Sequence, residues 1–404
     1  MDSKKWAEDI FVKIDNKLKH TINRQYGKLP YVAIDGVYND MLLENRICWW
    51  TNGFYGGILW QMYNATNDDI YKNAANDQCE LLDRALIEYD GLHHDVGFMY
   101  LHTAGAKYGL TGDLLAKRSL LHASNLLAGR FNIEGNYLRA WNQDKTGWVI
   151  IDSMMNIPLL FLAAKELNDP RSYKIAKAHA DTVLKYLVRE DGSAGHIASF
   201  NAETGEFIEQ LAGQGYSSNS AWSRGQSWAV YGFALAYRYT RDIRYLDAAK
   251  RLGYHFIANV SLTNFLPLVD FRMPNKANPK WDMSAAMCAV CGMLEIADLI
   301  ESDVNSKEQT HVGEIKPGIR TVDTEEAMQN SGTYQARIFR DVAIKMLKNV
   351  VEAHADFSTD KDGIIQYCSH SYHQEAETHV SFIYADYFLT EAVLRLLKKD
   401  YFIW

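Results

Sequence analysis

Two kinds of helical segment alternate along this chain of 404 residues, one almost free of charge and one amphipathic. A helix that is apolar on nearly every face is buried all round, whereas an amphipathic helix buries a single stripe. The almost uncharged segments begin near Gly53, Asp95, Asp152, Ala221, Asp282 and Thr378. The amphipathic segments begin near Lys4, Asp69, Asp113, Arg171, Ile243 and Thr333. The pattern therefore predicts twelve helices, six fully buried and six half-buried.

Strict alternation of buried and half-buried helices favours an inner ring of six helices wrapped by an outer ring of six. The sequence thus predicts an all-α fold, an (α/α)6 barrel, in which residues 1–404 form a single domain because no linker marks a second one. An irregular helical bundle is the alternative. In the barrel the inner helices all run parallel to one another, so their N-termini converge on one rim.

Long connections precede three of the expected inner helices, over residues 129–151, 189–220 and 259–281. Connections of this length are usually functional. Seven of the ten tryptophans lie in or beside the segments that lead into inner helices: Trp49, Trp50, Trp141, Trp148, Trp222, Trp228 and Trp281. This rim also collects the positive helix ends, so we expect it to bind a flat, anionic ligand. Residues 302–332 are polar and follow an inner helix, and we interpret them as an insertion on the opposite rim.

Aspartate recurs at helix starts throughout the chain. Before the amphipathic helices it stands in short turns, at Asp68, Asp113, Asp169 and Asp242. A side chain in this position accepts hydrogen bonds from the free amides of the helix that follows. These four aspartates are therefore predicted to be N-caps.

Asp95 and Asp152 begin two neighbouring inner helices, which would bring both carboxylates to the same level of the rim. Both could be N-caps. Alternatively they form a working pair, since two nearby carboxyls split in proton affinity. Asp152 follows the apolar residues 148–151, so it is the one expected to keep its proton near neutrality and act as general acid. Pro158 predicts that this helix either kinks or begins later than Asp152.

Arg224 lies just inside an otherwise uncharged helix, where an arginine is rare unless it is paired. Its partner could be Asp152, the acid group of a ligand, or a carboxylate in a purely structural ion pair. His93 and His94 are adjacent, which is not the spacing of a helical zinc site. The CxxC pair at residues 288–291 lies in an apolar helix without a second pair, so packing is favoured. No metal and no cofactor are expected.

Composition excludes several classes of partner. The net charge is −8 and no Lys/Arg-rich block occurs, which argues against nucleic acid and anionic membranes. No run of 18 apolar residues and no secretory signal is found, so no membrane span is expected. Five scattered cysteines fit the reducing cytoplasm better than a disulfide framework. No obligate protein partner is inferred.

Five segments spread over nearly the whole chain resemble the unsaturated glucuronyl hydrolases, glycoside hydrolase family 88. They are residues 50–54 (WTNGF), 94–98 (HDVGF), 151–156 (IDSMMN), 223–228 (SRGQSW) and 282–286 (DMSAA). The resemblance implies an (α/α)6 barrel that needs no metal. It also implies substrates that are short glycosaminoglycan or related oligosaccharides, produced by polysaccharide lyases, with a 4,5-unsaturated uronic acid at the non-reducing end.

The resemblance also implies a mechanism. Asp152 would protonate C4 of the vinyl ether and then take a proton from the water that adds at C5, after which the hemiketal opens and releases the partner sugar. Asp95 would hold sugar hydroxyls and help to keep Asp152 protonated. The residues implied to bind substrate are Trp50, Asn52, His94, Trp141, His196, Gln214, Trp222, Arg224, Trp228, Ser371, Tyr372 and His373.

One departure from the family concerns sulfate. In streptococcal members a Ser and Lys cluster before the last inner helix is associated with sulfated substrates. Here residues 368–373 read CSHSYH, without a lysine and with His373 in its place. A preference for sulfated fragments is therefore not implied.

Three other functions compete with this one. Unsaturated rhamnogalacturonyl hydrolases share the barrel and the chemistry but act on pectin fragments. An ordinary inverting glycosidase would use two carboxylates about 6.5–9.5 Å apart and would act on saturated glucuronides. A non-catalytic toroid would bind uronate oligosaccharides without turning them over.

Overall fold

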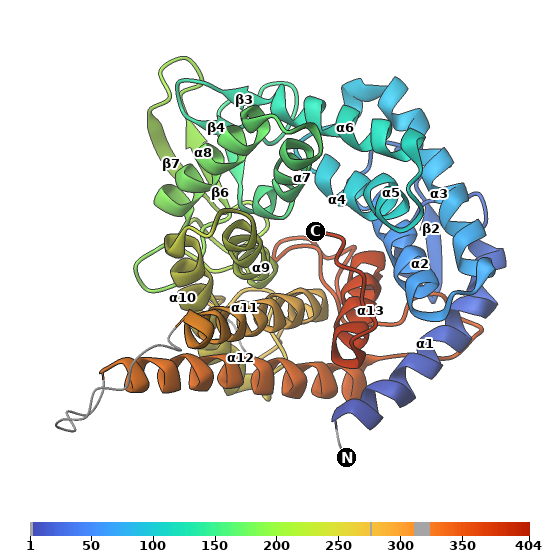
Figure 1. The fold of residues 1–404 in the computed structure, drawn as a ribbon. Coiled ribbons are helices and arrows are strands. Elements are labelled where there is room, and N and C mark those ends of the chain that lie inside the picture. Colours follow the sequence, from blue (N-terminus) through green and yellow to red (C-terminus); the bar gives the residue numbers. More distant parts are fainter. Residues whose placement is uncertain (1–2, 275–276, 311–323) are drawn as a thin grey trace.

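Twelve helices form two concentric rings in the computed structural model, which describes residues 3–274, 277–310 and 324–404, with side chains described outside 304–330 (Figure 1). The inner helices are α2 (Asn52–Thr66), α4 (Val96–Tyr100) continued by α5 (Ala106–Thr111), α7 (Pro158–Leu167), α9 (Ser223–Thr240), α11 (Met283–Thr310) and α13 (Ile383–Leu397). The outer helices are α1 (Ser3–Gln25), α3 (Asp69–Ile87), α6 (Leu114–Ala128), α8 (Pro170–Leu187), α10 (Ile243–Val260) and α12 (Thr324–His354). The (α/α)6 barrel is confirmed.

The inner ring is closed. Each inner helix contacts the next one along the chain, and α13 returns to contact α2, so the ring has no free edge (Figure 1). Burial follows the charge pattern: in α9 every residue from Ser223 to Tyr237 is buried, whereas α10 buries one stripe. One π-helical turn, Leu101–Gly105, joins α4 to α5. The alternation of charge along the sequence therefore reports which ring a helix joins.

Short antiparallel strands occupy the segments that lead into inner helices. The sequence pattern predicts loops for these segments. Strands β1 (Pro30–Ile34), β2 (Val37–Asp40) and β8 (Ser381–Phe382) form a sheet of order β2-β1-β8. Strands β3 (Phe131–Asn132) and β4 (Tyr137–Leu138) form a hairpin. Strands β5 (Trp148–Ile150), β6 (Ile197–Phe200) and β7 (Phe207–Leu211) form the third sheet. Several of these strands pair with partners distant in sequence, so the local pattern of hydrophobic and polar residues does not predict them.

The interpretation of residues 302–332 as an insertion is wrong for much of its length. Helix α11 continues to Thr310 and α12 begins at Thr324, so helix covers both flanks of this segment. Residues 311–323 lie outside the described residues. The flanks are therefore helical despite their polar composition.

Residues near the C-terminus fill the middle of the ring (Figure 1). Trp404 is only 2% exposed, stacks on Phe388 at 6.1 Å and lies edge-on to His102 at 4.5 Å. Its carbonyl accepts a hydrogen bond from the hydroxyl of Tyr239, at the end of α9. The barrel is therefore packed at the side opposite the inner-helix N-termini.

One helix among the described residues, over Met283–Asp303, is long and apolar enough to cross a membrane. The protein itself buries 94% of the apolar window, which is what an inner helix of this barrel requires.

Candidate active site

Asp152 lies between strand β5 and helix α7, in the 3-10 turn Ile151–Met155. Pro158 occupies the first turn of α7, so the helix begins after Asp152, as one of the two alternatives for Pro158 predicts. Sheet pairing fixes this turn, because the amide of Ile151 donates to the carbonyl of His196 at 3.0 Å, next to the β5–β6 pair. The turn thus carries Asp152 to the rim where the inner helices begin.

The environment of Asp152 favours its protonated form. The side chain is only 16% exposed, and Oδ1 is buried without a hydrogen-bond partner among the described residues. Burial is the main cause that raises the pKa of Asp152 to about 7, and the negative charge of Asp95 adds to it. His94 and Arg224 act in the opposite direction and lower the pKa of Asp152. A carboxyl in this state holds a transferable proton near neutral pH.

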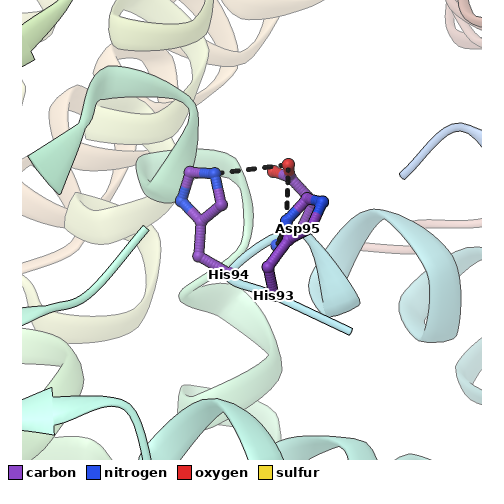
Figure 2. Close-up of side chains that lie close together, drawn as sticks. All are labelled: His93, His94 and Asp95. Atoms are coloured by element: carbon purple, nitrogen blue, oxygen red, sulfur yellow. Dashed lines mark hydrogen bonds and ion pairs between the residues drawn. The ribbon is translucent and has the colours of Figure 1, made fainter. Parts of the chain in front are cut away.

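Asp95 precedes α4 and lies between two histidines (Figure 2). Its Oδ2 is 3.2 Å from Nε2 of His94 and 3.3 Å from Nδ1 of His93. Its Oδ1 accepts a hydrogen bond from Nδ2 of Asn156 at 2.8 Å. Burial acts to raise the pKa of Asp95, but the two histidines and this hydrogen bond outweigh it and hold the pKa below its ordinary value. Asp95 is therefore the ionised member of the pair.

Asn156 joins the two aspartates. Its Nδ2 also donates to the backbone carbonyl of Asp152 at 3.1 Å, and its Oδ1 accepts from the amide of Phe98 at 2.8 Å. Gly97 allows this contact, because a Cβ there would lie 2.5 Å from Cα of Asn156. The first turn of α4 and the turn that carries Asp152 are thus fixed against each other.

Neither aspartate caps a helix with its side chain, although Asp95 occupies the N-cap position of α4. The side chain of Asp95 accepts no hydrogen bond from the first amides of α4, and the residue in the N-cap position of the 3-10 turn is Ile150, not Asp152. The capping alternative is wrong for both residues, whose carboxylates face side chains instead of helix amides.

Arg224 pairs with Asp282, which settles the alternatives left open by the sequence. Its Nη1 lies 2.5 Å from Oδ2 of Asp282, and its Nη2 donates to the carbonyl of His370 at 2.6 Å. The ion pair is completely buried, so Arg224 is not the direct partner of Asp152. Its Nε is buried without a partner among the described residues. The guanidinium lies over the ring of Trp222 at 4.5 Å.

His196 faces Asp152, with Nε2 at 4.0 Å from Oδ1. Its Nδ1 accepts the amide of Gln214 at 2.9 Å, so in the neutral ring the proton is on Nε2, toward Asp152. Burial lowers the pKa of His196 to about 3, which keeps the ring neutral. Trp222 packs against this ring at 4.4 Å. His196, Gln214 and Trp222 are therefore brought together beside Asp152.

Three other residues expected to bind substrate lie in the packed layer that supports the site. Trp228 is 1% exposed and packs on Phe98, which also contacts Trp50 at 5.5 Å. Asn52 is 1% exposed and donates to the carbonyl of Ile47 at 2.8 Å. These positions stabilise the rim.

The remaining expected residues lie on two flanking loops. Trp141 is 40% exposed and contacts Trp148 at 5.5 Å. Ser371, Tyr372 and His373 lie before β8, where the amide of Tyr372 donates to the carbonyl of Gln214 at 2.9 Å and Nε2 of His373 is 3.0 Å from the carbonyl of Tyr216. The second loop is therefore joined to the loop that carries Gln214.

His93, His94 and Asp95 also have the donor types of a metal site, with ligand atoms within 4.8 Å of one another (Figure 2). Metal-bound histidines usually donate their other ring nitrogen to a carbonyl or carboxylate. Nδ1 of His94 is buried without such a partner among the described residues, and Asp95 is engaged by Asn156. These contacts therefore indicate that the two histidines and Asn156 position the Asp95 carboxylate, and they do not fit the residues of a metal site.

The chain matches Glycosyl Hydrolase Family 88 over residues 21–268. The unsaturated glucuronyl hydrolase of Bacillus sp. strain GL1 is 36% identical over 287 residues, which cover 69% of this chain and 75% of the relative. This protein belongs to glycoside hydrolase family 88. It is a glycosidase of the unsaturated glucuronyl hydrolase type, as the resemblance of its motifs implies.

Further relatives of this family 88 chain extend the likeness over its full length. The unsaturated chondroitin disaccharide hydrolase of Streptococcus pneumoniae (strain ATCC BAA-255 / R6) is 30% identical over 407 residues, covering 98% of this chain and 94% of the relative. The crystal structure of the enzyme from Bacillus sp. GL1, described as responsible for the degradation of glycosaminoglycan, has a TM-score of 0.82 at 28% identity and covers 97% of this chain and 96% of that one.

Asn156 and Arg130, whose side chains bond to segments of this rim, were given no role from the sequence. Asn156 lies in the segment 151–156 that carries the family resemblance, four residues after Asp152. Arg130, which follows α6, has no motif of its own. Both act through contacts with residues distant in sequence.

Proposed function

We propose that this family 88 enzyme releases the 4,5-unsaturated uronic acid from the non-reducing end of lyase-generated glycosaminoglycan oligosaccharides. The observation that carries the proposal is a buried carboxyl with a raised pKa, Asp152, fixed beside an ionised carboxylate, Asp95, at a rim lined by indoles. Relatives named for unsaturated glucuronyl and unsaturated chondroitin disaccharide substrates support the substrate class.

The reaction begins at the C4=C5 double bond of the unsaturated uronate. The proton of Asp152 adds to C4, and the positive charge that develops at C5 is stabilised by the ring oxygen. Water adds to C5 and gives its proton to the Asp152 carboxylate, which restores the acid. The hemiketal then opens to a C5 ketone, and the hemiacetal at C1 releases the partner sugar. One aspartate thus serves as acid and then as base.

Asp95 has two functions in this scheme. As an anion it raises the pKa of Asp152, so that the acid is still protonated near neutral pH. Its oxygens can also accept hydrogen bonds from the hydroxyls of the uronate ring. His93 and His94 hold Asp95 in its ionised state, which keeps the proton on the other member of the pair.

The uronate carboxylate requires donors and flat surfaces at the rim. Nε2 of His196 and Nε of Arg224 are both buried without a hydrogen-bond partner among the described residues, so they are available to the carboxylate. The rings of Trp222 and Trp141 offer apolar faces to the sugars. Ser371, Tyr372 and His373 would contact the partner sugar, without the lysine associated with sulfate.

The test is to add the purified protein to an unsaturated chondroitin-type disaccharide and follow the ultraviolet absorbance of the C4=C5 chromophore. Loss of this absorbance with release of the partner sugar is expected. A rhamnogalacturonan-type unsaturated disaccharide and a saturated glucuronide are the comparison substrates. Faster turnover of the pectin-type substrate would assign the sister activity, and turnover of the saturated glucuronide would overturn the hydration mechanism. Binding without turnover would make the protein a lectin.

We also propose that the enzyme works in the cytoplasm and acts on substrate as a free protein. All five cysteines are free, and four of them are buried, which is typical of a reducing compartment. Cell fractionation with an antibody to the protein tests the location.

A further inference from the structure

We propose that Arg130 is a positioning residue of this active site, because its guanidinium fastens the segment that carries His94 and Asp95 to the loop that carries Trp141. The effect on turnover rests on the proposed function, whereas the effect on the backbone does not.

The guanidinium of Arg130 uses its donors on two chain segments. On the loop between β4 and β5, its Nε and Nη2 donate to the carbonyls of Arg139 at 2.8 Å, Ala140 at 3.0 Å and Trp141 at 2.9 Å. Its Nη1 donates to Oδ1 of Asn142 at 2.9 Å and lies 3.5 Å from the carbonyl of Leu92. One planar guanidinium therefore bonds to four consecutive residues, 139–142, and contacts the segment before Asp95.

The same carbonyls connect this loop to the aspartate. The carbonyl of Ala140 also accepts the amide of His94 at 3.1 Å. Nδ2 of Asn142 donates to the carbonyls of Asp90 at 2.9 Å and Leu92 at 3.1 Å. Residues 90–94 are thus held by polar contacts to the loop that Arg130 shapes, and the side chain of Asp95 follows directly after them.

A pocket borders these polar bonds on one side. A cavity of about 340 Å³ lies at this place, lined among others by Leu92, His93, Arg130 and Asn142. Leu92 packs into the hydrophobic core and His94 is buried, so the polar bonds of Arg130 and Asn142 add to this packing and fix the backbone before Asp95 on the side that faces the pocket.

The charge of Arg130 is unusual for a purely structural residue. The side chain is half-buried, and no carboxylate of the described residues forms an ion pair with it. Burial lowers the pKa of Arg130 to about 10, so the guanidinium is still charged at neutral pH. Burying a cation against neutral carbonyls costs desolvation energy that an ion pair would offset. Only arginine can make this set of bonds, because its planar guanidinium has five N–H donors, whereas a lysine has a single ammonium group.

The variant Arg130→Lys keeps the charge and removes the planar guanidinium. Small displacements of catalytic groups can lower rates by roughly 100-fold. We therefore expect kcat/KM on the unsaturated disaccharide to fall by about 10- to 100-fold, with a higher KM from the displaced Trp141 and a lower kcat from the displaced Asp95. Asn142→Ala removes one partner of the same cluster and should give a smaller change in the same direction.

Hydrogen exchange supplies a readout that does not depend on activity. In Arg130→Lys the amides of residues 92–98 should exchange faster, while those of α9 should not change. The matched control is Arg238→Lys, another half-buried arginine, which pairs with Glu295 far from the rim and should leave both kcat/KM and residues 92–98 unchanged.

Two results would overturn the proposal. One is a kcat/KM of both variants within twofold of the wild type. The other is unchanged exchange at residues 92–98 in Arg130→Lys, because any loss of activity would then reflect general destabilisation. If the wild-type protein turned over none of the substrates, the proposed function would fail, while the exchange experiment would still decide on Arg130.

Discussion

Aspartates stand before both inner and outer helices, and Asp95 and Asp152 behave differently from the four that precede outer helices. Before outer helices, Asp68, Asp113, Asp169 and Asp242 each accept the amide of the second residue that follows, at 3.1, 2.8, 2.9 and 3.2 Å. At the inner rim, neither Asp95 nor Asp152 accepts such a bond. Asp282, before the inner helix α11, also accepts the amide of Ser284 at 3.2 Å. The same residue type at a helix start is therefore a cap at most positions and a chemical group at positions 95 and 152.

The difference shows what sets the proton affinity of a carboxyl. Helix amides that donate to the carboxylate are the first cause of the lowered pKa of Asp68 and Asp113, and lysines add to it. Asp152 lacks these donors and is buried beside a second negative charge, so its pKa rises to about 7. Position relative to the core, and not residue type, decides between the two states.

The largest effect that can break this comparison is expected from Asp152→Asn. The amide cannot donate a proton to C4, so turnover should fall by roughly 10²- to 10⁴-fold, the usual contribution of a general acid. The fold should persist, because the amide has the same shape and no charge to bury. Steady-state kinetics and thermal unfolding measure the two outcomes. Wild-type turnover in this variant would remove Asp152 from the chemistry.

The matched control for that variant is Asp113→Asn. It makes the same substitution at a helix start in the outer ring, where asparagine can also cap a helix. Turnover should stay at the wild-type level.

Asp95→Asn tests the coupling between the two carboxyls through pH. In the wild type, activity should fall as pH rises through about 7, because Asp152 then loses its proton. The anion of Asp95 raises that pKa, so its removal lowers the pKa, and the alkaline limb of the kcat profile should move to lower pH. The rate at the optimum should also fall, since the uronate hydroxyls lose an acceptor. An alkaline limb that stays in place would show that Asp95 does not control the proton of Asp152.

The smallest effect is expected from Asp113→Ala. This variant removes the hydrogen bonds to the amides of Leu115 and Ala116, at 2.8 and 3.0 Å. Loss of such a cap typically lowers the free energy of unfolding by about 1 kcal/mol. Denaturant unfolding measures this change, and kcat/KM should not change. A loss of activity per folded molecule would contradict the division between the two rims.

Much of the fold could be predicted because charge along a helix reports its surroundings. The absence of charge between Arg224 and Arg238 was enough to place α9 in the inner ring. Residues 302–332 were interpreted as an insertion, but helix covers both flanks, because a polar composition alone does not distinguish a helix from a loop. The strand pair β5–β6 was missed because its pairing of Val149 with Ala198 is not local.

The candidate site was predictable only in part. The helix starts brought out Asp95 and Asp152, the family resemblance implied His196 and Gln214, and the structure places these residues at one rim. The partner of Arg224 could not be chosen from the sequence, because Asp152 and Asp282 both precede inner helices. Trp228 and Asn52 stand in the same motifs as rim residues, yet they are almost completely buried. Whether a residue of these motifs is buried depends on whether its side chain points into the core or toward the rim, which the motif alone does not show.

The sequence by itself determined the ring order, the caps of the outer helices and the presence of two aspartates at inner-helix starts. These features follow from hydrophobicity and helix-end chemistry, which act over a few neighbouring residues. The apolar residues 148–151 already favoured Asp152 as the protonated carboxyl. Only the tertiary structure decided how burial and Asp95 raise its pKa, which carboxylate pairs with Arg224, and which groups Asn156 and Arg130 contact. Desolvation and charge coupling depend on groups that the chain brings together from distant positions, so no local pattern contains them.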